Sequence, residues 1–295
     1  FDRAMALGTP PAAPFDIPFD GARMRAYLFP AEGAAEARRP LLILTNGYDG
    51  TLPEMYFSSA VAAVRRGYHV LAFDGPGQGG MLFEQGVAMR PDWETVVAAV
   101  VDHALTLPVV DPARIALSGW SLGGHLALRA ASGEKRLAAV IADPGLWSIT
   151  GGLADMARKM GASAADAQSA AAGDSAVANR LGEALFAHSP QARWSIRQRG
   201  FWVHGVSDFA GYLKAAGAFT LDGRAQDIRC PALLTMAEDD SRAMTAQQVY
   251  DALTGPKTLM RFTAAEGAGD HCEMMNRSLL NRRSLDWLDE TLGAG

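Results

Sequence analysis

Cysteine is nearly absent from this 295-residue sequence, which has only Cys230 and Cys272 and no C-x-x-C spacing. A disulfide framework needs more cysteines than two, so the fold must depend on its own core. A reduced, cytoplasmic setting is the simplest interpretation, with both thiols half-buried. Long apolar runs are absent as well, since none approaches the roughly 18 residues of a membrane helix. The first residue is not Met, which suggests a trimmed or processed chain.

Strong charge of either sign is also missing. The sequence has 27 Lys and Arg against 32 Asp and Glu, a formal net charge of −5, and its basic pairs are scattered. Proteins that bind nucleic acid or anionic lipid concentrate basic residues in one patch. We therefore expect a small-molecule substrate, no nucleic acid and no membrane, while a homodimer is left open. The 49% hydrophobic content is ordinary for a soluble enzyme.

What the sequence does contain is an alternation of strand-like and helix-like segments, which an Asp20-Gly21 hairpin opens. Apolar runs predict strands at 40–47, 68–75, 114–119, 137–143, 231–237 and 257–262. Helical spacing predicts helices at 54–67, 92–107 and 278–292. This alternation is typical of an α/β fold with a mostly parallel sheet and helices on both faces.

One region interrupts the alternation. Residues 150–229 contain no clear strand and are Ala-rich at first and aromatic afterwards. We interpret them as a helical lid inserted between the strands at 137–143 and 231–237. The predicted domains are therefore a core made of 1–149 and 230–295, and a helical cap made of 150–229.

The segment "RIALSGWSLGGHLALRAA" contains a G-x-S-x-G motif at 119–123, between a strand-like run and a helix-like run. This strand–turn–helix context is the one that the motif requires. Small residues at Gly119 and Gly123 leave room for a sharp turn. The hydroxyl of Ser121 then projects at the helix N-terminus, where developing negative charge is stabilised. Ser121 is the predicted nucleophile.

A nucleophilic serine needs a base, and the base needs an acid that orients it. In motifs of this kind the acid and then the base follow the serine along the chain. The candidate bases are His69, His103, His125, His188, His204 and His271. His271 alone lies in a Gly-rich loop between the last strand and the terminal helix, so it is the predicted base. His188 and His204 fall in the insertion, where either residue could line the pocket, although solvent exposure is the favoured expectation.

The acid is expected in "CPALLTMAEDDSRAM", where a predicted strand ends in three carboxylates. The usual spacing is G-x-x-D, and Ala237 stands in the place of the Gly, which selects Asp240. Asp239 is the second choice, because counting from Met236 would select it instead. Carboxylates in such a run are otherwise expected to be solvated.

An oxyanion hole requires two backbone N–H groups near the serine. One is expected from Leu122, the residue after the nucleophile, and the other from the loop "TNGYDGT". Gly47 permits a close approach there, so the N–H of Tyr48 is the predicted second donor. The Tyr48 phenol is expected either to touch substrate or to pack under the insertion.

A competing interpretation comes from "FDGPGQGG", in which Gly75, Gly77 and Gly80 fit the dinucleotide pattern G-x-G-x-x-G. That pattern needs a helix that begins within the motif and an acid at the end of the next strand. Here no clean helix start follows, and the next strand leads into the Ser121 turn. We therefore interpret the glycines as a tight strand-to-loop crossing beside the active-site face.

Aromatic residues gather in the second half of the insertion. They are Trp194, Phe201, Trp202, Phe209 and Tyr212. Aromatics in a lid favour a bulky, apolar or aromatic substrate, although each of them could instead fix the lid to the core. The predicted substrate contacts are Trp120, Trp194, Trp202, Phe209 and Tyr212. No metal and no cofactor are expected, since His271, Cys272 and Glu273 are adjacent and not spaced for chelation.

Several segments together resemble a known family: "TNGYDGT", "FDGPGQGG", "RPDWE", "SGWSLGGHLALRAASGEKRLAAVIADPG", "CPALLTMAEDD" and "EGAGDHCE…DWLDE". They are similar to the FrsA-like branch of the α/β-hydrolases, from about residue 15 to 292. That branch includes 2,6-dihydroxypseudooxynicotine hydrolase and fungal hydrolases that shorten polyketides by cleaving a carbon–carbon bond. The resemblance implies an α/β-hydrolase fold with Ser121 as nucleophile, Asp240 as acid and His271 as base.

Two departures from the family pattern stand out. Many members have an additional N-terminal helical segment that this sequence lacks or has lost. The nicotine-pathway enzyme has an insertion-borne carboxylate, and the corresponding stretch here, "SITGGLADMA", has no clear match. Asp155 lies nearby, but we do not assign it that role.

The sequence therefore predicts a serine hydrolase that acts on an ester, a thioester or the carbon–carbon bond of a β-diketone or polyketide-like compound. An acyltransferase or lyase of secondary metabolism would use the same triad. A catalytically silent ligand-binding protein on this fold is a third alternative, but such proteins usually lose triad members.

Overall fold

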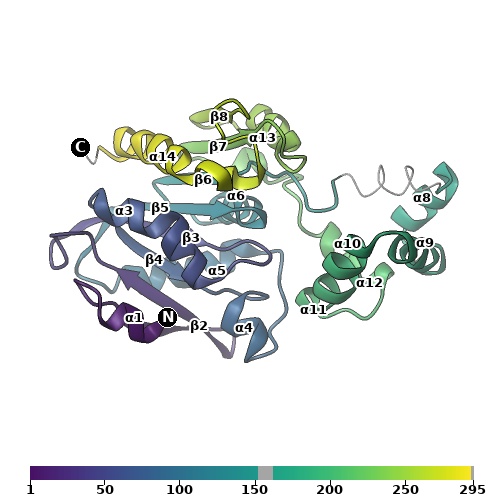
Figure 1. Cartoon of the computed structure of the whole chain (residues 1–295), viewed down its shortest axis with the longest axis horizontal. Helices are drawn as coiled ribbons and strands as arrows, with labels where there is room; N and C mark the ends of the chain where they lie inside the picture. The colour runs from purple at the N-terminus through teal and green to yellow at the C-terminus, as the bar shows by residue number, and fades with distance from the viewer. Residues whose placement is uncertain (152–161, 294–295) are drawn as a thin grey trace. The chain divides into compact units, whose positions relative to one another are not determined.

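The computed structural model describes residues 1–151 and 162–293 (Figure 1). The chain divides into two compact units. The first, which we call the sheet unit, consists of Phe1–Val87, Asp92–Trp147 and Leu221–Gly295. The second, the helical unit, consists of Ala88–Pro91 and Ser148–Thr220. The predicted cap at 150–229 begins two residues after the main part of the helical unit and ends nine residues beyond it, and the helical unit also includes Ala88–Pro91.

The sheet unit is built on one eight-stranded sheet in the order β1-β2-β4-β3-β5-β6-β7-β8. Its strands are β1 (Pro14–Phe19), β2 (Ala22–Phe29), β3 (Arg39–Thr45), β4 (His69–Phe73), β5 (Val110–Trp120), β6 (Ala139–Asp143), β7 (Ala232–Ala237) and β8 (Lys257–Phe262). The hairpin β1–β2 and the β2–β4 pair are antiparallel, and every pair from β4 to β8 is parallel. The prediction of a mostly parallel sheet is confirmed.

The hairpin turn follows from its two residues. Asp20 and Gly21 have φ angles of 49° and 78°, a left-handed pair that joins antiparallel strands with the right twist. In the parallel part of the sheet, all five residues of β4 and of β6 are buried. Strands that are buried along their whole length are typical of a parallel sheet covered by helices on both faces.

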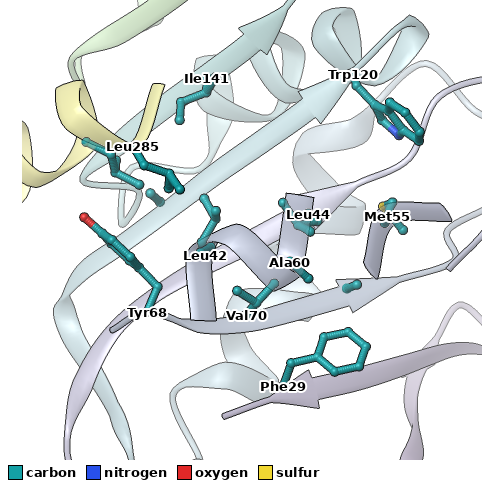
Figure 2. Packing of buried hydrophobic residues seen from close by; sticks show 14 of the residues in the cluster. Phe29, Leu42, Leu44, Met55, Ala60, Tyr68, Val70, Trp120, Ile141 and Leu285 are labelled. Carbon is teal, nitrogen blue, oxygen red and sulfur yellow. The ribbon is translucent and has the colours of Figure 1, made fainter. Parts of the chain in front are cut away.

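Helices cover both faces of the sheet (Figure 1). The helical segments of the sheet unit are α1 (Asp2–Ala6), α2 (Leu52–Met55), η1 (Tyr56–Ala60), α3 (Val61–Arg65), α4 (Gly79–Phe83), α5 (Trp93–Ala104), α6 (Leu122–Gly133), η3 (Ala225–Asp227), η4 (Ala243–Thr245), α13 (Ala246–Ala252), η5 (His271–Asn276) and α14 (Arg277–Leu292). Figure 2 shows η1 and α14 contributing Ala60 and Leu285 to a core that also holds Leu42, Val70 and Ile141 from the sheet. Helices α5 and α6 pack together, and α6 packs against β5 and β6 while α5 packs against β1.

The short helix α4 corrects one sequence expectation. We expected no clean helix start after the glycines of "FDGPGQGG", but α4 begins at Gly79, inside the motif. It extends for only five residues, because a loop follows that leads to Pro91 and the next helix. The strand after α5 still leads directly into the Ser121 turn.

The helical unit has a core of its own. Its elements are α8 (Ala164–Ala171), α9 (Ser175–His188), α10 (Pro190–Ala192), η2 (Arg193–Gly200), α11 (Phe201–His204) and α12 (Phe209–Gly217). The side chains of Ser163, Asp174, Ser189 and Asp208 cap four of them by accepting backbone N–H bonds. His204 is buried rather than solvated as expected, since its ring packs edge-on to Tyr212 and Phe219. Burial lowers the pKa of His204 to about 4.

Candidate active site

The turn that carries Ser121, the predicted nucleophile, connects β5 to α6 and is called the nucleophile turn. Ser121 lies between them with φ 58° and ψ −127°, a backbone conformation that is strained for any residue other than glycine. A Cβ at Gly119 would lie 1.9 Å from the carbonyl oxygen of Gly123, and a Cβ at Gly123 would lie 2.7 Å from the carbonyl oxygens of Thr45 and Asn46. The turn is therefore possible only with glycine at both motif positions.

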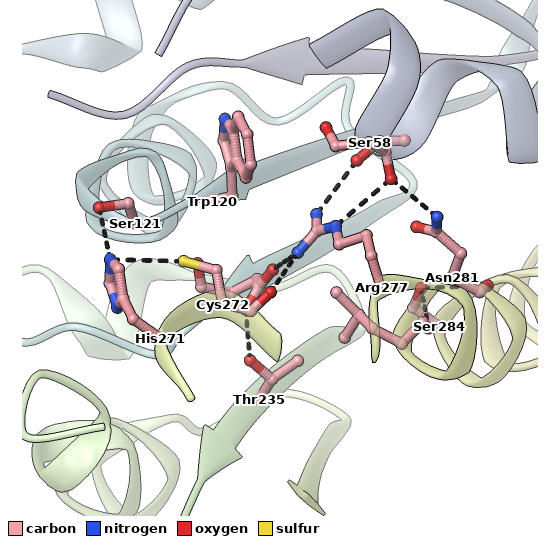
Figure 3. Close-up of polar contacts among 12 residues, drawn as sticks. Ser58, Trp120, Ser121, Thr235, His271, Cys272, Arg277, Asn281 and Ser284 are labelled. Atoms are coloured by element: carbon pink, nitrogen blue, oxygen red, sulfur yellow. Dashed lines mark hydrogen bonds and ion pairs between the residues drawn. The ribbon is translucent and has the colours of Figure 1, made fainter. Parts of the chain in front are cut away.

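His271 lies between Ser121 and Asp240, and Figure 3 shows its ring facing the Ser121 hydroxyl. Its Nε2 is 2.9 Å from Ser121 Oγ, and its Nδ1 is 2.7 Å from Asp240 Oδ2. The network assigns the proton to Nδ1, because a carboxylate can only accept there, which leaves Nε2 to accept from the serine hydroxyl. The three residues come from the ends of β5 and β7 and from η5, so segments up to 150 positions apart in the sequence meet at this point.

Asp240 rather than Asp239 faces the histidine. Asp240 is 4% exposed and also accepts the N–H of Arg242 at 2.9 Å, whereas Glu238 and Asp239 are exposed. Burial acts to raise the pKa of Asp240, but the hydrogen bonds from His271 and Arg242 outweigh burial and hold it below its ordinary value. Asp240 is therefore the ionised partner that fixes the imidazole tautomer.

The loop after β3 passes directly over the nucleophile. A Cβ at Gly47 would lie 2.9 Å from the Trp120 carbonyl oxygen and 3.0 Å from Ser121 Cβ. The N–H of Gly47 donates to the side-chain oxygen of Asn46 at 2.8 Å, so Gly47 itself is not available as an oxyanion donor. The same Asn46 oxygen accepts the indole N–H of Trp120 at 3.0 Å, which ties the loop to the nucleophile turn.

Gln78 is a site residue that the sequence did not reveal. It is 1% exposed, and its side-chain amide donates to the main-chain oxygens of Asn46 at 2.7 Å and Gly47 at 3.1 Å. In a trans peptide the C=O and the next N–H point in opposite directions. Because Gln78 holds the Gly47 carbonyl, the N–H of Tyr48 is directed to the other side. A polar side chain between glycines, in "GPGQGG", is the one signal that could have indicated this role.

A second missed group lies behind the triad. Arg277, at the start of α14, makes an ion pair with Asp143, which ends β6. The Asp143 carbonyl oxygen accepts the N–H of Ser121 at 2.6 Å. Cys272 is buried rather than half-buried as expected, and its Sγ lies 3.5 Å from His271 Nε2. The acid in "ADPG" and the arginine opening the terminal helix gave no sequence signal of this pairing.

The predicted substrate contacts differ in their surroundings. Trp120 is 8% exposed beside Asn46 in the sheet unit, whereas Phe209 and Tyr212, also 8% exposed, pack in the core of the helical unit. Trp194 and Trp202 are 57% and 49% exposed on the helical unit. Their contact with substrate stays a prediction. Asp155 lies outside the described residues.

The described residues bear on two further features, a metal site and a membrane-spanning helix. Within residues 1–151 and 162–293, no three His, Cys, Asp or Glu side chains are grouped so that they could hold a metal ion. No helix in that part of the chain has both the length and the apolar character that a membrane crossing requires.

Comparisons with known proteins show the family to which the chain belongs. The model of the alpha/beta hydrolase family matches residues 9–280. Hydrolase LUC6 of a Fusarium species is 32% identical over 99% of this chain and 72% of its own length. The 20-hydroxy-prefusarin hydrolase FUS2 of Gibberella moniliformis is 31% identical, also over 99% of this chain and 72% of its own length.

The crystal structure of 2,6-dihydroxy-pseudo-oxynicotine hydrolase superposes with a TM-score of 0.72, covering 98% of this chain and 70% of that one. At 23% identity, this likeness concerns the fold. The family match and the relatives that are more than 30% identical are the stronger result. The chain belongs to the alpha/beta hydrolase family, as its motifs predicted.

Proposed function

We propose that this protein is a serine hydrolase in which Ser121 is the nucleophile, His271 the general base and Asp240 the orienting acid. The observation that carries the proposal is the continuous chain Ser121 Oγ–His271 Nε2 (2.9 Å) and His271 Nδ1–Asp240 Oδ2 (2.7 Å). Its likeness to hydrolases of the same family supports the assignment.

The reaction follows from this geometry. His271 Nε2 removes the hydroxyl proton as Ser121 Oγ attacks a substrate carbonyl, and Asp240 stabilises the imidazolium that forms. The oxyanion of the tetrahedral adduct is held by the N–H groups of Leu122 and Tyr48. When the adduct collapses, His271 returns the proton to the leaving group. Water then repeats the sequence on the acyl-enzyme and releases the acid.

The proposed substrate is a bulky carbonyl compound of apolar or aromatic character. Two relatives are named for such compounds, 20-hydroxy-prefusarin and 2,6-dihydroxy-pseudo-oxynicotine. The exposed Trp194 and Trp202 of the helical unit would offer flat apolar surface if that unit acts as the lid. The scissile bond in this proposal is either the carbon–carbon bond of a β-diketone or polyketide-like compound, or an ester.

A fluorophosphonate probe tests the nucleophile directly, because it reacts only with an activated serine. The wild-type protein should gain the mass of one probe on the peptide that contains Ser121, and Ser121→Ala should not. Ser132→Ala is the matched control, since Ser132 is a buried serine of α6 that bonds the Arg129 carbonyl. An unlabelled wild type, or a labelled Ser121→Ala, would refute the proposal.

A further inference from the structure

Behind the triad, the end of β6 and the start of α14 bring together charged side chains that the proposed reaction does not use. The Asp143 carboxylate pairs with the Arg277 guanidinium, and the two side chains are only 3% and 15% exposed. The other Asp143 oxygen accepts the hydroxyl of Thr235 at 2.9 Å. Glu273, 1% exposed, lies against the same carboxylate.

One end of this cluster is hydrogen-bonded to Ser121, and the other end is hydrogen-bonded to the residue that follows His271. Asp143 accepts the N–H of Ser121 through its carbonyl oxygen, so it holds the nucleophile turn. Arg277 donates to the Cys272 carbonyl oxygen at 2.7 Å, so it holds the residue next to His271. The ion pair between Asp143 and Arg277 completes the connection.

The segment η5 (His271–Asn276) carries the proposed base, and we call it the base loop. Its backbone needs such a restraint. Cys272 and Glu273 both have left-handed backbone, with φ angles of 57° and 48°. Non-glycine residues in this region are strained and persist only where their surroundings hold them. Arg277 has further anchors for this purpose: it donates to the Ser58 carbonyl at 3.3 Å and to Ser59 Oγ at 3.1 Å.

We propose that Arg277 and Asp143 are positioning residues that fix the distance between Ser121 and His271 by tying the nucleophile turn to the base loop. They touch neither substrate nor the reacting atoms, and they act through the two residues that do. This inference rests on the proposed function, because it assigns a role in setting the geometry of that triad.

The charges around Glu273 determine its protonation state. Two buried carboxyls, Asp143 and Glu273, face one guanidinium, and the carboxylate of Asp240 also acts on Glu273. Burial and the neighbouring charge of Asp143 raise the pKa of Glu273 far above its ordinary value. Glu273 is therefore a neutral acid beside the Asp143 carboxylate, while Arg277 balances the charge of Asp143.

The first test removes the guanidinium. Arg277→Met should lower kcat for a small activated ester such as p-nitrophenyl butyrate, and the rate of fluorophosphonate labelling, on the order of 10²-fold with KM unchanged. Arg277→Lys should recover part of kcat, because an ammonium can pair with Asp143 but cannot bridge to Cys272 and Ser58 in the same planar geometry.

The control separates positioning from stability. Arg129 of α6 is a comparably buried arginine that makes two hydrogen bonds with Glu94, at 2.9 and 3.0 Å, and has no bond to the base loop. Arg129→Met should lower the unfolding temperature as Arg277→Met does, because both changes remove a largely buried guanidinium from its carboxylate, and Glu94 then keeps only the longer ion pair with Arg224 at 3.8 Å. Its kcat per folded enzyme should stay at the wild-type value.

The second test keeps the proposal falsifiable if Arg277→Met does not fold. Glu273→Gln should retain wild-type kcat, because an amide is isosteric with the neutral acid and stays uncharged beside Asp143. Glu273→Leu, which places no polar group next to the Asp143 carboxylate, should lower kcat.

Three results would overturn the inference. They are a wild-type kcat in folded Arg277→Met, an Arg277→Lys no different from wild type, and a Glu273→Gln as inactive as Glu273→Leu. Failure of the proposed function itself would look different, since the wild-type protein would then not be labelled at all.

Discussion

The side-chain amide of Gln78 holds the main-chain oxygen of Asn46 at 2.7 Å, 32 positions earlier in the sequence. The same amide reaches the Gly47 oxygen at 3.1 Å, and its own oxygen accepts the N–H of Gly75 at 3.0 Å. Gln78 thus joins the loop after β4 to the loop that carries the predicted oxyanion donor. The glycines of "FDGPGQGG" serve this crossing: a Cβ at Gly75 would lie 2.7 Å from the Trp93 ring.

Gln78→Glu should therefore impair catalysis more than binding. A carboxylate in this buried place would turn acceptors toward the carbonyls of Asn46 and Gly47 and would release the Gly47–Tyr48 peptide. Loss of one oxyanion donor costs about 10²–10³ in kcat, so we expect a fall of that order with KM little changed. Steady-state kinetics on an activated ester measures both constants. Equal kcat in Gln78→Glu and wild type would show that this brace does not set the oxyanion hole.

The two neighbouring aspartates give a matched pair of variants. Asp240→Asn should lower kcat by about 10⁴, because an amide in that place favours the wrong imidazole tautomer. Asp239→Asn should leave kcat near the wild-type value, since Asp239 is exposed and its backbone N–H, not its carboxylate, bonds to Gly269. The reverse order of effects would assign the acid to Asp239.

The fold was largely predictable because it depends on local patterns. Strand β8 has the predicted bounds, and most of the others differ by one or two residues. The start of β5 was missed: the strand begins at Val110, through "VDPA", where pairing with β3 rather than an apolar run defines it. The short α4 was missed because five residues give too little periodicity to recognise.

The residues of the candidate site were likewise predictable where a local motif contains them and not where distant contacts define them. Ser121 and His271 lie in motifs that are readable locally, whereas Asp240 and Asp239 differ only in burial, which the sequence does not state. Gln78 and Arg277 act on partners 32 and 134 positions away. Such contacts depend on the register of the sheet, so no local pattern could indicate them.

Asp74, which follows β4, should make the free energy of unfolding depend on pH. It is 5% exposed, and burial raises its pKa to about 6 from 3.8. Between these two values the folded state binds more protons than the unfolded state, so the free energy of unfolding falls as pH rises through that window. Above the folded pKa the loss is complete, at about 3 kcal/mol for a shift of this size.

Asp74→Asn should remove that loss. The amide oxygen can still accept the N–H of Gly80, which Asp74 binds at 3.2 Å. The variant should be more stable than wild type at pH 8 and nearly equal to it at pH 4, as measured by urea unfolding at both values. A stability difference that does not change with pH would contradict the assignment.

Within the helical unit, alanine substitutions of Trp202 and Phe209 should affect different quantities, the first substrate binding and the second stability. Trp202 is half-exposed, with the Arg199 guanidinium over its ring at 5.5 Å, whereas Phe209 packs edge-on to Phe186 at 5.6 Å inside the unit's core. If the unit is the lid, Trp202→Ala should raise KM for a bulky aromatic substrate and leave the unfolding temperature unchanged. Phe209→Ala should cost about 3–5 kcal/mol of stability. A Trp202→Ala variant with unchanged KM on every bulky substrate would remove this tryptophan from the substrate contacts.

The last prediction concerns the bond that is cleaved. The same oxyanion hole can stabilise the adduct of a ketone or of an ester, because both give a tetrahedral oxyanion. The leaving groups differ: a carbanion departs only if it is delocalised or is protonated as it leaves. Among the triad residues, the imidazolium of His271 is the proton donor for that step. Its Nε2 already lies 2.9 Å from the Ser121 oxygen, so it is placed to reach the departing atom.

A panel of paired substrates distinguishes the two reactions. β-Diketones and acyl-phenols should each be offered beside an ester of the same acyl group, with products followed by mass and Ser121→Ala as the blank. We expect cleavage of at least one ketone whose carbanion is stabilised by a neighbouring carbonyl or a phenol ring, and none of a simple dialkyl ketone, because its carbanion has no such delocalisation. Efficient turnover of every ester without cleavage of any ketone would exclude the carbon–carbon reaction and leave an esterase.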